Sequence, residues 1–407
     1  MSTYYQDANT TILHGDCIET MRTMPADSID SIVTDPPYGL GYMGKKWDAL
    51  PPVEEWAREC LRVLKPGGHI LAFGGSRTWH RLAVAIEDAG FEIRDGVLWL
   101  YGSGFPKSHD ISKALDKMAG AEREVLSEKR KLQSYGSTDS GDVNAVFVGG
   151  PDKGGVQKIT TPATPEAQQW DGWGTALKPA YEPAVMARKP FPGTVARNVL
   201  AHGTGAINID ACRIAANPAT FGIGGGSKVG SGAGENQSPS GYRTNGKVSP
   251  MNPSGRFPAN LILDEHTAEL LDQQSGNVGA SGGNRGKPKA PSGNQATGIK
   301  LSNQRSQVSH GDHGGASRFF YVAKAPKSER PVVDGVAHAT VKPLKLMQYL
   351  VRMVTPPGGT ILEPFAGSGT TIEAALIEGY NVIGIERETD YLPLIQHRIN
   401  RANGGKP

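Results

Sequence analysis

Apolar and polar positions change period repeatedly along the first hundred residues, which predicts strands and helices in alternation. Short apolar runs predict strands at 11–14, 31–34, 69–73 and 97–100. Helical spacing predicts helices at 18–24, 53–64 and 77–89, and Lys65-Pro66-Gly67-Gly68 predicts a helix stop and turn. The run 69–73 is apolar throughout, as is typical of a strand buried on both faces of a parallel sheet. The alternation therefore predicts a doubly wound α/β fold.

The C-terminal part, about 336–400, repeats this style. Its predicted elements are a helix at 344–354, a turn at 356–359, strands at 360–363 and 382–386, and helices at 370–378 and up to 398. The middle of the chain differs, because 218–256 and 275–317 are dense in Gly, Ser, Asn and Pro. That composition predicts long loops or disorder, with ordered pieces between them at 260–263 and 268–271.

Composition agrees with a large insertion and excludes several classes of protein. The chain has 53 glycines in 407 residues and a hydrophobic fraction of 38%, and the loops hold much of the glycine. At roughly 100–200 residues per domain, this length fits two domains or one enlarged domain. Three scattered cysteines exclude a disulfide scaffold and a cysteine-based zinc site. No apolar run reaches the roughly 18–20 residues of a membrane span and no signal-peptide pattern is present, so we expect a cytoplasmic protein.

Charge changes this picture only locally, because the net charge is +3. The second glycine-rich loop carries the basic residues Arg285, Lys287, Lys289, Lys300 and Arg305 against the acidic Asp312. This pattern indicates either a solvated flexible loop or a loop that contacts a polyanion. His310 and His313 lie in the same loop, and we expect neither of them to bind a metal ion.

The first candidate site is Asp35-Pro36-Pro37-Tyr38, placed where an apolar strand ends. Ligand sites of open α/β sheets lie outside the carboxyl ends of the strands. Two prolines fix φ and remove backbone donors, so the Asp35 carboxylate and the Pro36 carbonyl form a rigid set of acceptors beside an aromatic ring. Such a set fits the amino group of a nucleobase, on which Tyr38 would stack with ~1–3 kcal/mol. The alternative is a turn without function.

The second candidate site lies between a strand and a helix and reads Glu363-Pro364-Phe365-Ala366-Gly367-Ser368-Gly369-Thr370-Thr371. Its glycines let a ligand approach the backbone, and the helix N-terminus offers N–H groups. No lysine follows the glycines as in a phosphate-binding P-loop, and Ile372 takes the place of the third glycine of a dinucleotide fingerprint. Glu386 ends the next strand, where an acidic residue bonds a ribose in nucleoside-binding sheets. The pattern indicates a nucleoside cofactor without an essential phosphate.

An amine-presenting site beside a nucleoside site points to S-adenosylmethionine. On these two motifs the chain resembles the amino-methylating DNA methyltransferases, which act on adenine N-6 or cytosine N-4. The order, with DPPY before FxGxG, resembles the permuted β group, and the resemblance covers about 1–115 and 320–407. It implies a circularly permuted, Rossmann-like methyltransferase sheet and in-line methyl transfer to a base flipped out of double-stranded DNA. The aspartate form of the tetrapeptide favours adenine.

The resemblance also implies roles for individual residues. Those that hold the base and catalyse transfer are Asp35, Pro36, Pro37 and Tyr38. Those that bind the cofactor are Asp16, Lys342, Glu363, Phe365, Gly367, Ser368, Gly369, Thr370, Thr371 and Glu386. Among these, Glu386 takes the ribose, Asp16 faces the adenine, and Lys342 belongs to a segment that closes over the methionine moiety.

Two of these positions, and the neighbouring Cys17, also have a simpler interpretation. Asp16 fits the N-cap of the helix at Ile18, a role compatible with cofactor binding. Lys342 can instead be a surface lysine before a proline. Cys17 fits a small buried residue, since methylation of an amine needs no cysteine nucleophile.

The predicted domain organisation follows from the motifs. It comprises a target-base half at 1–115, a partly flexible insertion at 116–180, a returning catalytic strand at 181–190, a target-recognition region at 191–330, and a cofactor half at 331–407. The stretch 104–108 resembles a loop near the target base. Within 191–330, Arg197-Asn198, Asn208-Ile209-Asp210 and Gly255-Arg256-Phe257-Pro258 offer side chains that either read base edges or fold the region.

Three alternatives to adenine methylation stay open. The nearest is cytosine N-4 methylation of DNA. An RNA or protein amine as substrate is a different class of enzyme, and a non-catalytic, cofactor-sensing DNA-binding module is a third. A cognate restriction endonuclease and a homodimer are compatible with the resemblance, and no motif gives the recognition sequence.

Overall fold

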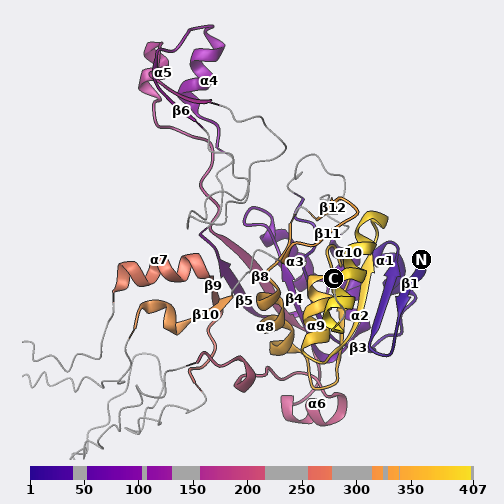
Figure 1. The fold of residues 1–407 in the computed structure, drawn as a ribbon. Coiled ribbons are helices and arrows are strands. Elements are labelled where there is room, and N and C mark those ends of the chain that lie inside the picture. Colours follow the sequence, from indigo (N-terminus) through magenta and orange to yellow (C-terminus); the bar gives the residue numbers. More distant parts are fainter. Residues whose placement is uncertain are drawn as a thin grey trace, which may run out of the picture. The chain divides into compact units, whose positions relative to one another are not determined.

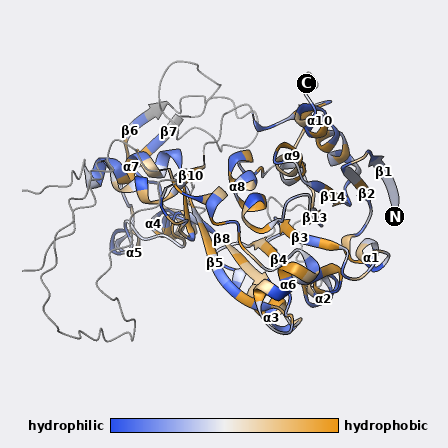
Figure 2. Cartoon of the chain, turned by 90° about the horizontal axis from the view of Figure 1, so that it is seen from below, coloured by the Kyte–Doolittle hydropathy of each residue, from blue (hydrophilic) through white to orange (hydrophobic). Residues whose placement is uncertain are grey.

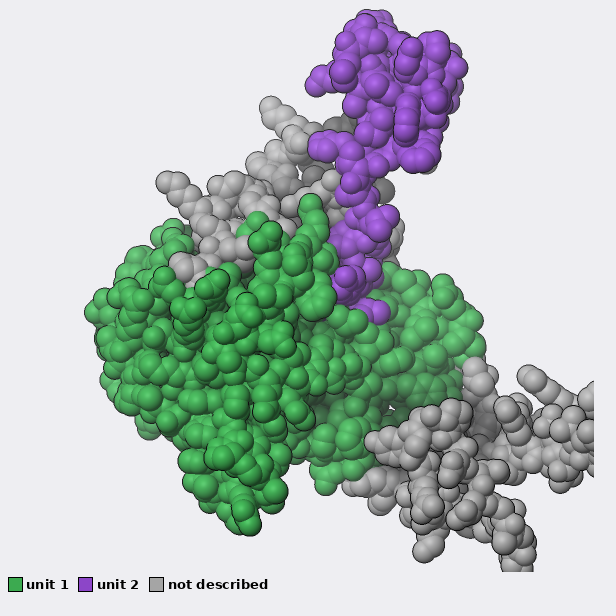
Figure 3. All heavy atoms as spheres, turned by 180° about the vertical axis from the view of Figure 1, so that it is seen from behind, with its two compact units in different colours: residues 1–99, 183–407 green, residues 100–182 purple. Residues whose placement is uncertain are grey.

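The computed structural model describes eight stretches of the chain, namely residues 1–39, 53–102, 108–130, 156–215, 255–276, 314–323, 329–338 and 340–404. The predicted basic loop, both histidines in it, nearly all of the two glycine-rich loops and residues 104–107 lie outside these stretches. The chain divides into two compact units, one of residues 1–99 and 183–407 and one of residues 100–182 (Figure 3).

Ten described strands form one sheet, in the order β1-β2-β14-β13-β3-β4-β8-β5-β9-β10. Their bounds are β1 (Ser2–Gln6), β2 (Thr10–His14), β3 (Ile29–Thr34), β4 (Leu64–Phe73), β5 (Glu92–Leu100), β8 (Tyr181–Arg188), β9 (Leu261–Asp264), β10 (Tyr321–Ala323), β13 (Thr360–Glu363) and β14 (Asn381–Glu386). The five strands from β2 to β4 run parallel, whereas β1 and β8 are antiparallel to their neighbours β2 and β4. This sheet confirms the predicted α/β class.

Helices cover both faces of this sheet, because successive strand residues point to opposite sides. On β3, Val33 packs with one core cluster and Ile32 with the other. The first cluster includes buried side chains of α8 (Leu344–Val354), α9 (Thr370–Ile377) and α10 (Leu392–Ala402). The second includes buried side chains of α1 (Cys17–Arg22), α2 (Val53–Val63) and α3 (Trp79–Asp88). Figure 2 shows these two helical layers with the sheet between them, and Figure 1 shows the same elements coloured along the chain.

The predicted elements of the two halves are largely confirmed. The predicted helix at 344–354 and strand at 360–363 match α8 and β13 residue for residue. The strand β5 begins five residues before the predicted one, at Glu92. β1 was not predicted. It is an edge strand whose residues are nearly all exposed, so it carries no apolar alternation.

The predicted turn at Lys65–Gly68 is wrong, because β4 already starts at Leu64 and runs through it. Gly67 and Gly68 exchange backbone hydrogen bonds with Lys189, which follows β8. Gly67 has φ +81°, a conformation that favours glycine. The Pro-Gly-Gly sequence is therefore a distorted strand start held by neighbouring backbone, and not a free turn.

The remaining described elements of the first unit flank this sheet. They are α6 (Val195–His202), α7 (Glu265–Ser275), β11 (Val332–Val333) and β12 (Val336–Ala337), with three short 3-10 turns at Asp210–Cys212, Ala316–Phe319 and Thr389–Tyr391. The predicted ordered pieces at 260–263 and 268–271 correspond to β9 and α7. None of the described helices combines the length and apolar character needed to cross a bilayer.

The second unit contains two helices and a two-stranded sheet. They are α4 (Ile111–Met118), α5 (Pro165–Gln169), β6 (Val125–Arg130) and β7 (Val156–Thr160), with β6 antiparallel to β7. The sequence predicts only a partly flexible insertion here, because these elements are short and mostly exposed.

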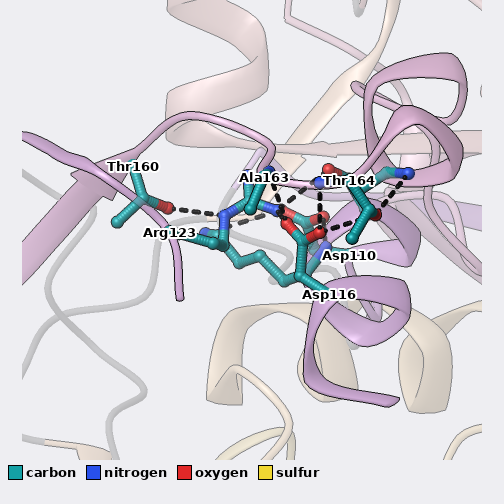
Figure 4. Close-up of polar contacts among 9 residues, drawn as sticks. Asp110, Asp116, Arg123, Thr160, Ala163 and Thr164 are labelled. Carbon is teal, nitrogen blue, oxygen red and sulfur yellow. Dashed lines mark hydrogen bonds and ion pairs between the residues drawn. The ribbon is translucent and has the colours of Figure 1, made fainter. Parts of the chain in front are cut away.

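The buried carboxylate of Asp116 organises this unit (Figure 4). It accepts hydrogen bonds from the backbone N–H groups of Ala163 and Thr164, at 3.0 and 2.9 Å, and from the Thr164 hydroxyl at 2.8 Å. Arg123 pairs with it at 2.6 Å and also donates to Thr160. Burial alone would raise the pKa of Asp116, but these donors outweigh it and lower the pKa. One acid thus joins α4 to the start of α5 and to the β6–β7 sheet.

Replacing Asp116 by asparagine should loosen the second unit while leaving the large sheet intact. Asparagine cannot accept all four bonds or pair with Arg123. Hydrogen exchange of the full-length chain should rise at least about tenfold in 108–130 and 156–169, and stay unchanged in β13 and β14. The matched control is Asp110→Asn, which alters an exposed helix cap, and equal exchange in both variants would contradict the assigned role.

Candidate active site

Two adjacent parallel strands bring the two predicted sites together. β3 leads into Asp35-Pro36-Pro37-Tyr38, and β13 leads into the turn at 363–371, with Leu362 paired to Ile32. Parallel strands place their carboxyl ends at the same edge of the sheet. Motifs more than 300 positions apart in sequence therefore lie at neighbouring strand ends, as the permuted order implies.

The carboxylate of Asp35 is the centre of a three-residue polar network. Its Oδ1 accepts a hydrogen bond from the Tyr38 hydroxyl at 2.8 Å, and its Oδ2 lies 2.6 Å from Lys342 Nζ. Lys342 Nζ also donates to the Tyr38 hydroxyl at 3.0 Å. The tetrapeptide side chains are thus oriented toward one another by hydrogen bonds and an ion pair.

Lys342 is buried, with only 8% of its side chain exposed, so the interpretation as a surface lysine is wrong. Its Nζ lies 4.9 Å from the ring centroid of Phe73 and 5.3 Å from that of Tyr38, within the range of cation–π attraction. The Thr78 hydroxyl holds the segment Asp35–Tyr38 in place by donating to the Tyr38 carbonyl at 2.8 Å. A buried ammonium needs such compensation, because its desolvation is costly.

Glu363 connects the two candidate sites through hydrogen bonds. Its Oε1 accepts from the Thr34 hydroxyl at 2.5 Å and from the Phe365 N–H at 3.1 Å, and its Oε2 accepts from the Thr371 hydroxyl at 2.6 Å. The side chain is fully buried, and burial raises its pKa to about 8 despite these donors. Its contacts make Glu363 a residue that positions both strand ends.

The glycine turn has a backbone that requires glycine at two points. Gly367 and Gly369 have φ of +51° and +81°. A Cβ on Gly369 would lie 3.1 Å from Ile395 Cα, and one on Gly367 would lie 3.3 Å from His338 Nε2. The turn therefore packs against α10 on one side and against His338 on the other. Burial lowers the pKa of His338, which keeps its imidazole neutral near pH 7.

Glu386 and Asp16 lie at the ends of two further neighbouring strands, β14 and β2. Glu386 accepts from the N–H groups of Gly367 and Glu388, at 2.6 and 2.7 Å, and burial raises its pKa to about 7. Asp16 accepts from the N–H groups of Ile18 and Glu19, which confirms its role as the N-cap of α1. Gly15 ties the two ends together by donating to the Glu386 carbonyl.

The other predicted residues of the turn are largely buried. The Phe365 ring lies 5.8 Å from that of Trp56 and packs toward α2, and its backbone N–H binds Glu363. The hydroxyls of Ser368 and Thr370 lie 3.1 Å apart. Phe365 thus anchors the turn through its ring, while Gly367 and Gly369 let the turn pack closely against His338 and α10.

Several candidates for base reading are structural. Asn198 is buried in α6 and donates to the carbonyls of Pro66 and Thr204, both at 2.8 Å. Asn208 accepts from the Ala211 N–H, and Arg256 donates to the Arg318 carbonyl beside the Phe319 ring. The sequence gives no burial information, so it could not separate these side chains from ones that contact a ligand.

Cys17 follows Asp16 directly in sequence. Cys17 is buried, and burial raises its pKa to about 12, so its thiol stays protonated. This confirms its interpretation as a small buried residue. Within the described residues, no group of three or more His, Cys, Asp or Glu side chains could hold a metal ion.

Sequence reasoning missed three contributors to this site, namely Thr34, Thr78 and His338. Thr34 is the residue before Asp35, and its hydroxyl at a buried strand end is the only sequence signal for its bond to Glu363. His338 packs edge-on against Tyr391, with ring centroids 4.5 Å apart. No local pattern marks Thr78 or His338, because their partners lie far away in sequence.

Comparison with known proteins agrees with this geometry. The family model described as DNA methylase matches residues 29–127 and 287–397, slightly more than half of the chain, and these ranges include both candidate motifs. The chain belongs to the N6/N4 DNA methylase family. Asp35 to Tyr38 and the turn at 363–371 are thus parts of a methylase scaffold.

Individual relatives match parts of this methylase. The type II methyltransferase M.HinfI of Haemophilus influenzae is 34% identical over 110 residues, covering 22% of this chain and 31% of the relative. M.HindIII of the same species is 24% identical over 243 residues, covering 48% of this chain and 64% of the relative. The chain thus spans less than two thirds of these relatives. Among solved structures, the PvuII cytosine-N4-specific DNA methyltransferase aligns over 99% of this chain and 95% of its own, at 14% identity and a TM-score of 0.42.

Replacing Glu363 by glutamine should change how stability depends on pH. The folded carboxyl has a pKa of about 8 against 4.5 in its ordinary state, so the folded protein binds more protons between these values. This group's contribution to stability is therefore full below pH 4.5 and is lost as pH rises to about 8. Glutamine does not titrate. Relative to the unsubstituted protein, Glu363→Gln should gain up to about 1.4 kcal/mol per pH unit across that window.

Denaturant unfolding at pH 5, 6, 7 and 8 measures this difference. The matched control is Glu54→Gln, which removes an exposed carboxylate of α2 and should show no such trend. A difference between Glu363→Gln and the unsubstituted protein that stays constant with pH would contradict the raised pKa.

Proposed function

We propose that this methylase transfers a methyl group from S-adenosylmethionine to the N-6 amine of adenine in double-stranded DNA. The observation that supports this most strongly is the position of Asp35 to Tyr38 beside the turn at 363–371, at neighbouring strand ends. One side offers acceptors and a ring to a base, and the other offers a nucleoside site. A methyl donor and an amine bound there would meet at one edge of the sheet.

The residues of the turn fit the proposed cofactor. Gly367 and Gly369 give the turn its left-handed backbone conformation, and Glu386 offers a carboxylate to ribose hydroxyls at a strand end. No basic side chain lies within 363–371, which suits a nucleoside without a phosphate. When bound, S-adenosylmethionine supplies an electrophilic methyl group on a sulfonium sulfur, which leaves as a thioether.

The tetrapeptide suits an amine nucleophile. An aromatic amine is a poor nucleophile because its lone pair is delocalised into the ring. Asp35 and the Pro36 carbonyl would accept hydrogen bonds from its two N–H groups, favour a pyramidal nitrogen, and stabilise the positive charge that develops as the N–C bond forms. The nitrogen then releases one proton to water. The amine is paired inside a duplex, so the base must first leave the stack. Tyr38 can then stack on the flipped base.

Adenine is the proposed base because the aspartate form of the tetrapeptide favours it. Cytosine N-4 methylation is the nearest alternative, and identification of the modified base decides between them. A cofactor-sensing module without activity is disfavoured by the complete set of acceptors at Asp35 and Tyr38.

We propose residues 191–330 as the target-recognition region of this enzyme. The described part of that region uses Asn198, Asn208 and Arg256 for its own folding. A cognate restriction endonuclease and a homodimer remain predictions of the resemblance.

Replacing Asp35 by alanine should abolish methylation. Expressed in cells without other DNA methylases, the unsubstituted chain should place N6-methyladenine at one short sequence, and long-read sequencing gives base and site together. With Asp35→Ala, transfer should fall by at least about 10³-fold, because the main acceptor for the amine is gone. Binding of S-adenosylhomocysteine should stay at least as tight. Unchanged transfer, or N4-methylcytosine as product, would overturn the respective part of the proposal.

Cofactor affinity should depend on pH through Glu386. With a pKa of about 7, this carboxyl is protonated below pH 7 and then loses its capacity to accept from both ribose hydroxyls. Affinity for S-adenosylhomocysteine should therefore rise by about tenfold from pH 6 to pH 8 and level off above. Glu386→Gln should bind more weakly and without this dependence, as calorimetry would show. A pH profile shared by both proteins would rule out Glu386 as the titrating group.

A further inference from the structure

The ammonium of Lys342 and the proposed base amine compete for one carboxylate. Lys342 Nζ lies 2.6 Å from Asp35 Oδ2, and the Tyr38 hydroxyl occupies Asp35 Oδ1 at 2.8 Å. Both oxygens of the proposed acceptor are therefore already engaged inside the protein. A carboxylate whose charge is compensated by an ammonium is a weaker acceptor for the hydrogens of an amine.

This arrangement also places a positive charge where the proposed reaction tolerates it poorly. The sulfonium of the cofactor is positive before transfer, and the attacking nitrogen becomes positive during it. With only 8% of its side chain exposed, Lys342 is little screened by solvent. A cation held at Asp35 therefore opposes methyl transfer, so the pair describes a state that precedes the reaction.

The Lys342 backbone is anchored, but its side chain can change partners. The N–H of Leu344 donates to Glu329 Oε2 at 2.8 Å, and Arg398 Nη2 holds the Glu329 carbonyl at 2.7 Å. These bonds fix the start of α8 directly after Lys342. The four-carbon stem of a lysine rotates freely and carries three donors.

Lys342 is close in sequence to a residue that contacts the glycine turn. His338, four positions before Lys342, has its Nε2 3.3 Å from the point where a Cβ on Gly367 would lie. The two residues thus lie beside the glycine turn and beside the tetrapeptide, respectively. The amino-acid part of S-adenosylmethionine carries an α-carboxylate, an anion of the kind that a lysine ammonium pairs with.

We propose that Lys342 is an exchangeable cation: it pairs with Asp35 in the free protein and transfers to the cofactor's α-carboxylate, which releases Asp35 for the base amine. This inference rests on the proposed function. Lys342 then acts as a positioning residue through Asp35, and cofactor binding prepares the site for the base. The exchange makes and breaks ion pairs only.

Calorimetry with two ligands tests the exchange without DNA and without turnover. S-adenosylhomocysteine carries the carboxylate, whereas 5′-methylthioadenosine keeps the nucleoside and lacks the amino-acid part. Asp35→Asn removes the competing anion, so it should tighten S-adenosylhomocysteine binding by about three- to tenfold, the factor by which the pair withholds Lys342. It should leave 5′-methylthioadenosine binding unchanged within about twofold, which also verifies folding.

Lys342→Met is the second variant of a double-mutant cycle with Asp35→Asn. It should weaken S-adenosylhomocysteine binding, and adding Asp35→Asn to it should bring no further tightening. The matched control is Lys345→Met, an exposed lysine of α8, which should behave like the unsubstituted protein. If Asp35→Asn binds neither ligand, Asp35→Ala takes its place in the same cycle.

The outcomes separate this inference from the proposed function. If the unsubstituted protein binds no S-adenosylhomocysteine, the proposed function fails, and the inference fails with it. The exchange alone is wrong if the unsubstituted protein binds S-adenosylhomocysteine but Asp35→Asn tightens the binding of neither ligand, or of both ligands equally. It is also wrong if Asp35→Asn tightens S-adenosylhomocysteine binding by the same factor in the Lys342→Met background.

Discussion

The buried carboxyl group of Glu363 is the interaction on which the geometry of the site depends. It bonds Thr34, which directly precedes Asp35, and Thr371, which lies in the first turn of α9 after the glycines. One side chain therefore sets the spacing between the proposed base-binding and cofactor-binding segments. Burial of a carboxyl group is costly, and it is tolerated because three donors satisfy it and because protonation relieves its charge up to about pH 8.

The sheet makes this junction possible. Val33 and Ile32 of β3 pack into opposite helical layers, so the strand is fixed from both sides before its end reaches the site. The same alternation fixes β13 through Ile361 and Leu362. Two strands held this way leave little freedom for the segments that follow them. Polar groups at their ends can therefore be placed with the precision that in-line transfer requires.

Much of the sheet and the positions of both motifs could be predicted from the sequence, because buried strands such as 360–363 and amphipathic helices such as α8 carry their own periodicity. The site's internal bonds could not be predicted. The contact between Lys342 and Asp35 joins residues 307 positions apart, and a lysine before a proline has no local feature that indicates burial. The antiparallel direction of β8 and the small unit around Asp116 were also beyond prediction, since both depend on tertiary pairing. Residue types and spacing thus indicated the class of reaction. The hydrogen-bond and ion-pair partners within the site could be identified only from the fold.

The distance in sequence between Asp35 and Lys342 has a consequence for synthesis of the chain. At about 5–20 residues per second, roughly 15 to 60 seconds pass between translation of these two residues. During that interval Asp35 and β3 exist without Lys342, Glu363 and the neighbouring strand β13. Until β13 and β14 are made, β2 and β3 each have one unpaired edge, and α1 to α3 can cover only one face of these strands. The order of the two motifs along the chain therefore makes assembly of the site one of the last events in folding.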